Sequence, residues 1–420
     1  MKKRPVSFCL LVLGAIVTAI PLATSAAAEP TVVAGTGNPD IDVPAVQAAV
    51  NQGGQVLLKG HFSFDAPPAI STALAGAGYP SAMVLVSKPV AISGARDEFG
   101  DITSIAAGTI PFYVEAPGVA VRIENLRFVR PKAEAVLVYA VSGLTIASCQ
   151  IKGVDPLPNF GSTGIDINTS GDIPNPNQPG HPENVSRTLL IVNNDIDVAG
   201  GTAGDDTTGV NVWSVGVPAA EVQAFISGNT VTNFNEKGIN MRRALGRVNI
   251  ERNLVTSDTI MGPAPGASGI WVANLGSYLI AHNSVHTLWA NGSGFGIEVR
   301  SQSQFSQWSV SGAIVVDNHV NMDAPAGTVF NANSAGIHIL GNATGNSVQD
   351  NRIDGRAGAA LAVAAQGGLA SDNTFALNRV DDFDASVPDV SVGAGVLNTQ
   401  ILGQQGAIVD QGANTVIVPL

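Results

Sequence analysis

Short hydrophobic runs recur along most of this chain, and a polar residue stands at a fixed place between them. The most frequent pattern is an apolar residue, two variable residues, Asn, one variable residue and then Val or Ile. Because alternate residues of a strand face the same side, this pattern predicts two short strands joined by a bend at the Asn. The Asn positions of the pattern are Asn194, Asn229, Asn253, Asn283, Asn318, Asn351 and Asn378.

A second pattern consists of Gly, then Ile or Val, a variable residue and another hydrophobic residue. It lies between successive copies of the first pattern. One repeat therefore predicts three short strands, with the hydrophobic residues inward and the variable residues outward. The glycines of this second pattern are Gly164, Gly209, Gly238, Gly269, Gly296 and Gly336.

Equivalent positions of the repeat are 23 to 45 residues apart, a spread that turns of variable length on a constant core produce. One coil cannot cover its own apolar face, so the coils must stack about 4.8 Å apart by parallel pairing. We therefore predict an all-β protein, a single-stranded right-handed parallel β-helix over residues 61–420. Asn suits the bend because it tolerates the left-handed conformation. Its amide can also bond to the Asn of the next coil, so we interpret the Asn row as structural.

A different segment precedes the repeats. Asp42–Val50 has the pattern of a short amphipathic helix, and Gly53–Leu58 follows as a strand. This opening, the Asn row and the three-strand coil resemble the pectin-lyase-like superfamily of right-handed β-helix proteins, over nearly all of the mature chain. The resemblance implies that residues 29–60 form an N-terminal cap helix and the first strand. It leaves the function open, because this fold carries many activities.

The first residues have the features of a secretory signal peptide. Three basic residues precede an apolar run from Phe8 to Leu22, and small residues follow up to Ala28. We predict that residues 1–28 are removed and that the mature protein is secreted or periplasmic in a bacterium. No later segment is apolar enough to span a membrane, so we expect no span in the mature chain. Cys149 is then the only cysteine, which excludes a disulfide within the chain.

Charge narrows the range of partners. The chain has 33 acidic residues against 21 Lys and Arg residues, and its formal net charge is −12. Nucleic-acid binding needs a basic surface, so this balance argues against a nucleic-acid partner. We expect a monomer whose partner is a polysaccharide or oligosaccharide, for the reasons that follow.

Loop lengths indicate which face of the coil is functional. Long, irregular connections flank the Gly-Ile strand, whereas the Asn bend stays short throughout. Long loops beside one strand build walls, and the outward residues of that strand become the floor of a groove. Coil by coil, the outward pairs are Asp166 and Asn168, Asn211 and Trp213, Asn240 and Arg242, Trp271 and Ala273, Glu298 and Arg300, and His338 and Leu340.

These outward residues suit a glycan. Trp rings stack on sugar rings, Arg binds carboxylates through paired hydrogen bonds, and Asp, Glu or His can transfer protons. We predict substrate binding by Asn211, Trp213, Asn240 and Trp271. The predicted catalytic residues are Asp166, Arg242, Glu298, Arg300 and His338.

Three functions stay open at this point. Hydrolysis by an inverting enzyme needs two carboxyl groups about 6.5–9.5 Å apart, which neighbouring coils can supply. β-Elimination on a uronic acid polymer needs a base and a cation at the sugar carboxylate. We expect no cofactor and no metal site, except Ca²⁺ held by acidic loops such as Asp205-Asp206 if the protein is a uronate lyase. The alternative to an enzyme is a non-catalytic surface or periplasmic scaffold that binds glycans or is purely structural.

Overall fold

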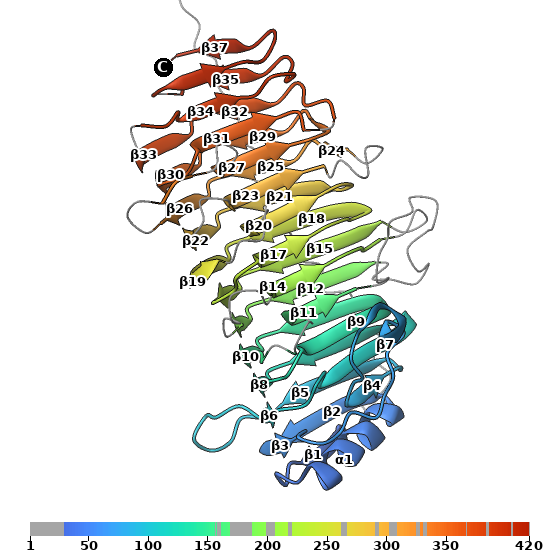
Figure 1. The fold of residues 1–420 in the computed structure, drawn as a ribbon. Helices are drawn as coiled ribbons and strands as arrows, with labels where there is room; N and C mark the ends of the chain where they lie inside the picture. The colour runs from blue at the N-terminus through green and yellow to red at the C-terminus, as the bar shows by residue number, and fades with distance from the viewer. Residues whose placement is uncertain are drawn as a thin grey trace, which may run out of the picture.

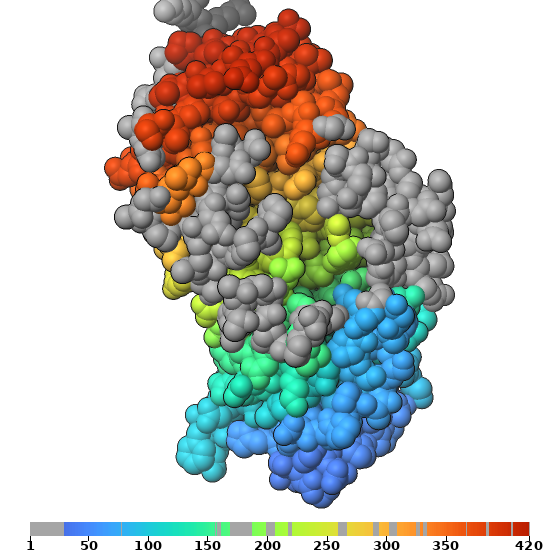
Figure 2. Space-filling model, viewed as in Figure 1, coloured from blue at the N-terminus to red at the C-terminus, as the bar shows by residue number. Residues whose placement is uncertain are grey.

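The chain forms a long stack of parallel strands in the computed structural model. It begins with strand β1 (Thr31–Ala34) and helix α1 (Pro39–Gln52) and ends with strand β37 (Val416–Val418) (Figure 1). The space-filling view shows an elongated body whose colours follow chain order from one end to the other (Figure 2). The all-β parallel β-helix with a short N-terminal helix is thereby confirmed. The structure describes residues 29–155, 157, 161–168, 187–198, 206–216, 221–261, 267–289, 294–301, 309–324, 328–330, 334–366, 368–383, 386–404 and 406–419.

The predicted signal segment, residues 1–28, lies outside the described residues. Among the residues that are described, no helix has the length and apolar character needed to cross a membrane.

Each coil contributes up to three strands, and each strand pairs in parallel with its equivalents in the neighbouring coils. The strands on the face of the Gly pattern are β4 (Val84–Val86), β11 (Ser162–Ile167), β14 (Thr207–Val212), β17 (Lys237–Met241), β20 (Ala267–Ala273), β23 (Gly294–Arg300), β27 (Ala335–Leu340), β31 (Ala359–Ala364), β34 (Val390–Val392) and β36 (Ile408–Asp410).

The second kind of strand precedes the Asn bend. Its members are β1 (Thr31–Ala34), β2 (Gly54–Lys59), β5 (Val90–Gly94), β12 (Thr188–Val192), β15 (Val222–Ser227), β18 (Gly246–Glu251), β21 (Ser277–Ala281), β25 (Ile314–Val316), β29 (Ser347–Gln349), β32 (Thr374–Ala376), β35 (Gln400–Leu402) and β37. Two long strands, β7 (Phe112–Glu124) and β9 (Glu134–Ala147), run from the first kind into the second and join both into one 24-stranded sheet.

The third kind of strand follows the Asn bend and forms an 11-stranded sheet. Its members are β3 (His61–Ser63), β6 (Ser104–Ala106), β8 (Arg127–Val129), β10 (Gln150–Lys152), β13 (Asp195–Asp197), β16 (Thr230–Thr232), β19 (Leu254–Met261), β22 (Ser284–Trp289), β26 (His319–Asp323), β30 (Arg352–Gly355) and β33 (Arg379–Phe383). Outside these two sheets lie the short pair β24 (Val310–Ser311) and β28 (Ala343–Thr344) and a 3₁₀ turn at Ala75–Ala77.

The register stacks like residues on one another through the core. Ile239 lies opposite Ile270, which lies opposite Ile297 in the next coil, and all three side chains are fully buried. Full burial of such a side chain contributes about 1.5–3 kcal/mol, so each added coil stabilises its neighbours through hydrophobic contact as well as through backbone hydrogen bonds.

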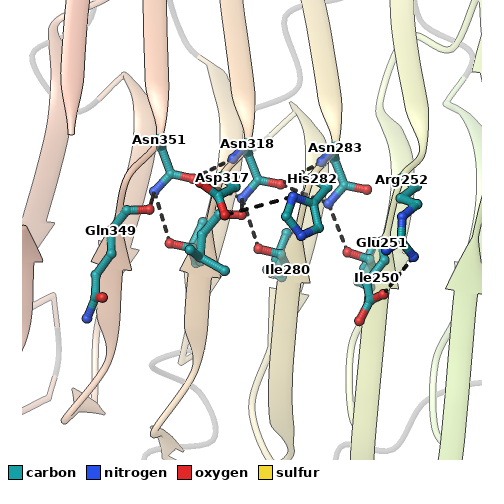
Figure 3. Close-up of polar contacts among 12 residues, drawn as sticks. Ile250, Glu251, Arg252, Ile280, His282, Asn283, Asp317, Asn318, Gln349 and Asn351 are labelled. Atoms are coloured by element: carbon teal, nitrogen blue, oxygen red, sulfur yellow. Dashed lines mark hydrogen bonds and ion pairs between the residues drawn. The ribbon is translucent and has the colours of Figure 1, made fainter. Parts of the chain in front are cut away.

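The Asn row forms a continuous ladder of buried amides (Figure 3). Nδ2 of Asn283 donates to the carbonyl oxygen of Ile250 in the preceding coil, at 2.8 Å. It also donates to Oδ1 of Asn318 in the following coil, at 2.9 Å, and that oxygen accepts the backbone N–H of Asn283 too. The same contacts recur from Asn194 to Asn378. The structural role predicted for the row is therefore confirmed.

The left-handed residue of the bend is not the one that the sequence indicated. At each bend, the residue with positive φ, between 53° and 66°, comes directly before the Asn of the row. These residues are Asn193, Gly228, Arg252, His282, Asp317, Asp350 and Leu377. The reason is geometric, because the Asn side chain must point along the stack to reach its partner, and the preceding residue therefore makes the turn.

A second, shorter amide ladder lies at the corner before the strands of the second kind. The backbone N–H and Nδ2 of Asn346 both donate to Oδ1 of Asn373, at 3.1 and 2.9 Å. Oδ1 of Asn346 in turn accepts the backbone N–H of Ala313 at 2.9 Å. Asn side chains therefore link the C-terminal coils at two corners. The sequence did not reveal the second corner, because its Asn occurs in too few coils to be recognised as a repeat.

The glycines of the second pattern are explained by lack of space. A Cβ added to Gly269 would lie 2.3 Å from Cγ1 of Val285 and 2.8 Å from the carbonyl oxygen of Gly296. The other five glycines have the same surroundings, with a core Val or Ile at 2.2 to 2.6 Å. The strand after the bend therefore packs directly against the backbone of the Gly-Ile strand, and no larger residue fits there.

Helix α1 lies at the N-terminal end of the stack, where it buries Val46, Ala49 and Val50 against the first coils. Asn38 caps it by accepting the backbone N–H of Asp40 at 3.1 Å. Asp42 fixes it to the stack, because its carboxylate accepts the backbone N–H groups of Thr36, Gly37 and Ser63. The helix thus covers apolar side chains that an open stack would expose to water.

Loss of one ladder amide should be costly. Asn283→Ala leaves the carbonyl of Ile250 and two donors of Asn253 without their partners in a buried place. We expect it to lower the free energy of unfolding by about 3 kcal/mol, seen as a lower midpoint in urea. Asn249→Ala, on the half-buried outward side of β18, is the matched control and should change the midpoint little. Equal midpoints for both variants would contradict a structural role of the ladder.

Added volume at the glycine row should also destabilise the fold. Gly269→Ala forces its methyl group into Val285, and overpacking of this kind costs about 1–3 kcal/mol. Gly143→Ala in β9 is the control, because its nearest neighbour would be an ordinary contact at 3.6 Å. Thermal denaturation followed by circular dichroism should show a lower midpoint for Gly269→Ala alone. A variant at Gly269 as stable as the unaltered protein would refute the steric explanation.

Candidate functional site

A pocket of about 420 Å³ lies on the outer side of the Gly-Ile strands, over β9, β11, β14, β17, β20 and β23. Its size falls within the range of about 300–1,000 Å³ that small-molecule sites have. The pocket is lined by Tyr79, Glu134, Gly161, Thr163, Asp166, Asp206, Thr208, Asn211, Trp213, Glu236, Lys237, Asn240, Arg242, Trp271 and Arg300.

Seven of the nine residues predicted for the site line this pocket. They are Asp166, Asn211, Trp213, Asn240, Arg242, Trp271 and Arg300. Glu298 and His338 are not among the lining residues, although they belong to the same outward column. Their side chains are almost fully buried, which differs from the exposed position at a groove floor that the sequence indicated.

The sequence-based view missed one column of the pocket. Glu134, Thr163, Thr208 and Lys237 lie opposite one another in successive coils, and each of the last three stands directly before a motif glycine. Strict alternation would turn that position inward. Because the motif glycine itself faces the core side chains, the alternation shifts there by one residue. The position before the glycine then faces outward, beside the predicted columns.

Carboxyl groups and a tyrosine gather at the N-terminal end of the pocket. The hydroxyl of Tyr79 donates to Oδ2 of Asp166 at 2.9 Å and accepts Nδ2 of Asn168 at 2.6 Å. Asn211 donates from Nδ2 to Oδ1 of Asp166 at 2.8 Å. Glu134, in the preceding coil, shares a hydrogen bond with Asp166. This group is called the acid end below.

The two carboxyl groups of the acid end differ in their affinity for a proton. Burial raises the pKa of Asp166 to about 6, and hydrogen bonds from Tyr79 and Asn211 lower it. Burial raises the pKa of Glu134 well above its usual range, and the neighbouring charge of Asp166 raises it further. Burial thus favours a proton on both groups, and the charge of Asp166 favours the proton on Glu134, so within the pair Glu134 is suited to donate a proton and Asp166 to accept one.

Three cations, Lys237, Arg242 and Arg300, form the opposite end of the pocket, which is called the cation end below. Arg242 stacks on Trp213, with its guanidinium carbon 3.8 Å from the ring centroid. The ammonium group of Lys237 lies 5.3 Å from the centroid of Trp271 and forms an ion pair with Glu236.

These contacts change the role expected for the two tryptophans. Trp271 is only 4% exposed, and the ring of Trp213 is covered by Arg242. Trp271 therefore has little surface for stacking on a sugar, and one face of Trp213 is occupied by Arg242. The rings instead hold the cations in place, since each cation–π contact contributes about 0.5–2 kcal/mol.

Glu298 and His338 form a buried pair beside the cation end. Burial raises the pKa of Glu298 to about 7, while the charges of Arg300 and Lys237 lower it. Burial and the charge of Arg300 lower the pKa of His338 to about 3, so its imidazole is neutral. The ring of His338 stacks on Phe295, with centroids 4.8 Å apart. Nη1 of Arg300 lies 3.6 Å from Oε1 of Glu298. We therefore interpret Glu298 and His338 as residues that position the Arg300 side chain.

The two carboxyl groups among the predicted catalytic residues, Asp166 and Glu298, do not come together. Asp166 and Glu298 belong to coils four steps apart, which is about 19 Å at the strand spacing. That separation is twice the largest value that inversion allows. Asp166 and Glu134, by contrast, belong to neighbouring coils and interact directly.

A Ca²⁺ site was expected only with a uronate lyase. Among the described residues, no group of three or more His, Cys, Asp or Glu side chains is arranged to hold a metal ion. Asp206 lines the pocket, whereas Asp205 lies outside the described residues. In the described part of the pocket, the positive charge is supplied by the cation end.

The raised pKa of Glu298 predicts how stability depends on pH. The folded protein keeps a proton on Glu298 that the unfolded chain releases above its normal pKa of about 4.5. This residue therefore makes the protein less stable as pH rises from about 4.5 to 7. We expect Glu298→Gln to remove part of that loss, so that its urea midpoint exceeds that of the unaltered protein at pH 8 more than at pH 4.5. A constant difference across this range would contradict the assignment.

A family model agrees with this architecture. A family model described as "Right handed beta helix region" matches residues 112–380. No curated protein sequence matches the chain significantly. Among solved structures, the Dettilon tailspike protein (gp208) is 13% identical, with a TM-score of 0.47 over 91% of this chain and 68% of that one. The A-module of the mannuronan C-5 epimerase AlgE6 from Azotobacter vinelandii is 12% identical, with a TM-score of 0.29 over 92% of this chain and 98% of that one.

Proposed function

Since this chain belongs to the right-handed beta-helix family, we propose that its pocket binds a uronic acid polysaccharide and cleaves it by β-elimination. The observation that carries the proposal is the pairing of an acid end with a cation end in one pocket. Asp166 and Lys237 lie two coils apart, about 10 Å along the stack. A carboxylated sugar held by the cations thus comes within reach of the base.

The cation end supports binding of a sugar carboxylate. Arg242 and Arg300 present planar guanidinium groups that suit paired hydrogen bonds to a carboxylate, and Lys237 adds a third charge. Glu134, Asp166, Asp206 and Glu236 line the same pocket, so it is the placement of Arg242 and Arg300 at one end, and not a net positive charge, that supports carboxylate binding. Neutralising the carboxylate in this way also makes the neighbouring C5 proton more acidic.

The acid end supports proton transfer. In β-elimination the C5–H bond breaks, its electron pair forms the double bond between C4 and C5, and the bond from C4 to the linking oxygen breaks. Asp166, ionised at neutral pH, accepts the C5 proton. Glu134, whose pKa is raised by burial and by the charge of Asp166, supplies a proton to the departing oxygen. The proton taken up by Asp166 then restores Glu134 through their shared hydrogen bond.

The middle of the pocket supports binding of hydroxyl groups. Nδ2 of Asn240 donates to Oδ1 of Asn211 at 2.7 Å, whereas Oδ1 of Asn240 is buried and has no hydrogen-bond partner among the described residues. A buried acceptor without a partner costs about 1–3 kcal/mol, so a sugar hydroxyl that donates to it gains affinity. This agrees with the substrate-binding role expected for both asparagines.

The two alternatives are less well supported. Hydrolysis is less well supported because Asp166 and Glu298, the two carboxyl groups among the predicted catalytic residues, are four coils apart. A non-catalytic scaffold accounts for the cations but gives no reason for a buried base beside a second buried carboxyl group. Product formation separates the enzyme from the scaffold.

The test is a panel of uronic acid polymers and neutral glycans, read for binding and for ultraviolet-absorbing unsaturated ends. We expect products from a uronic acid polymer only, and a rate that rises as pH passes about 6, because Asp166 must lose its proton to act as the base. Asp166→Asn should reduce the rate about 10²- to 10⁴-fold and retain binding.

The matched control is Asp195→Asn, which removes a carboxylate paired with Lys152 on the strand after the Asn bend. It should leave the rate unchanged. Binding of a uronic acid polymer without unsaturated ends at any pH would overturn the enzyme and leave the scaffold. Absence of both binding and product across the panel would overturn the proposed function altogether.

A further inference from the structure

A segment from early in the chain crosses the face that carries the pocket. Its two ends, Ile70 and Ala82, form an antiparallel bridge with backbone hydrogen bonds of 3.1 and 2.7 Å. Between them, the backbone N–H of Ala73 donates to the hydroxyl of Tyr113 at 3.0 Å. The segment from Ile70 to Ala82 is therefore fixed over β7 and β9. In the stack, β9 pairs with β11 and β7 pairs with β9. This segment is called the crossing segment below.

The crossing segment covers the column that continues from Asp166 toward the N-terminal end. In the two preceding coils this column holds Leu137 and then Tyr113, and both side chains are fully buried. They belong to a separate apolar cluster with residues of the crossing segment. The buried members of this cluster are Leu74, Ala82, Ile110, Tyr113, Ala133 and Leu137. The pocket floor therefore does not continue as an open groove beyond Asp166.

Tyr79 stands at the boundary between the apolar cluster and the pocket. It packs against the cluster on one side and lines the pocket on the other. The hydroxyl of Tyr79 forms hydrogen bonds to Asp166 and to Asn168, the two outward residues of β11 and the position after it, and these bonds hold the ring in place. The ring and the crossing segment behind it thus form an end wall at the acid end.

We propose that this pocket accepts the end of a polysaccharide chain, and that Tyr79 is the specificity-determining residue that stops the chain beside Asp166. The inference rests on the proposed function and specifies its substrate further. The pocket binds the ends of polysaccharide chains and not their internal segments. A groove that is open at both ends lets a polymer pass through and be cut anywhere. An end wall beside Asp166 places the first sugars of a polysaccharide chain at this residue. The rest of the chain then extends away from the N-terminal coils.

The first experiment compares the number of bonds broken with the loss of viscosity, for polygalacturonate and alginate. Cleavage at chain ends releases short unsaturated products from the start, while viscosity falls slowly. Internal cleavage lowers viscosity steeply after few bonds are broken. We expect the slow fall for the unaltered protein, and a steep fall from the first bonds broken would overturn the inference while leaving the proposed function intact.

Variants of Tyr79 test the wall itself. Tyr79→Ala removes the ring and should shift cleavage toward internal bonds, with a steeper loss of viscosity per bond. Tyr79→Phe keeps the ring without its hydroxyl, so cleavage should stay at chain ends while the pH dependence of the rate shifts upward. Tyr139→Ala is the control, because Tyr139 packs on the same apolar cluster without lining the pocket. Terminal cleavage by a folded Tyr79→Ala variant would overturn the role of Tyr79.

A binding measurement separates this inference from the proposed function. Calorimetry with galacturonate and mannuronate oligomers of increasing length should show an affinity that stops rising once the pocket is filled. An affinity that keeps rising with length would overturn chain-end binding even if products are formed. Failure of all these oligomers to bind would overturn the proposed function, and the inference with it.

Discussion

The constraint on which the rest of this structure depends is the fixed spacing between coils. Backbone hydrogen bonds between parallel strands set that spacing, and the amide ladder from Asn194 to Asn378 fixes the register at one corner. Each ladder amide uses both of its donors and accepts two N–H groups, so a shift of one residue would leave several buried groups unpaired. The glycine row adds a steric limit, because a side chain at Gly269 would meet Val285.

The pocket is a consequence of this register. Outward side chains from successive coils are held one strand spacing apart, so residues far apart in sequence become fixed neighbours. Asp166, Asn211 and Asn240 form a hydrogen-bonded row along the stack in this way, although they span 75 residues. The same regularity orders charge along the stack, since Glu134 and Asp166 belong to the first coils of the pocket and Arg242 and Arg300 to later ones, while Lys237 is paired with Glu236. A polar ligand with one carboxylate would therefore bind in one orientation.

Sequence periodicity predicted the fold and most of the pocket floor, because the motifs themselves specify the register. It could not predict which side chains would meet. The ring of Trp213 pairs with Arg242, and Glu298 is buried beside Arg300, through rotamers that spacing does not specify. The column of Lys237 was missed because the glycine interrupts the alternation of the strand. Tyr79 was missed because it reaches Asp166 across 87 residues, from a segment without the repeat.

The end wall and the chemistry at the acid end have one physical cause. The crossing segment excludes water from the N-terminal end of the pocket, and burial is the largest contribution to the raised pKa values of Asp166 and Glu134. The hydroxyl of Tyr79 then favours the ionised form of Asp166 over that of its neighbour, which separates base from proton donor. An open groove at this place would solvate both carboxyl groups and return their pKa values toward about 4. Closing the pocket at Tyr79 therefore fixes both where a chain must stop and which group can take its proton.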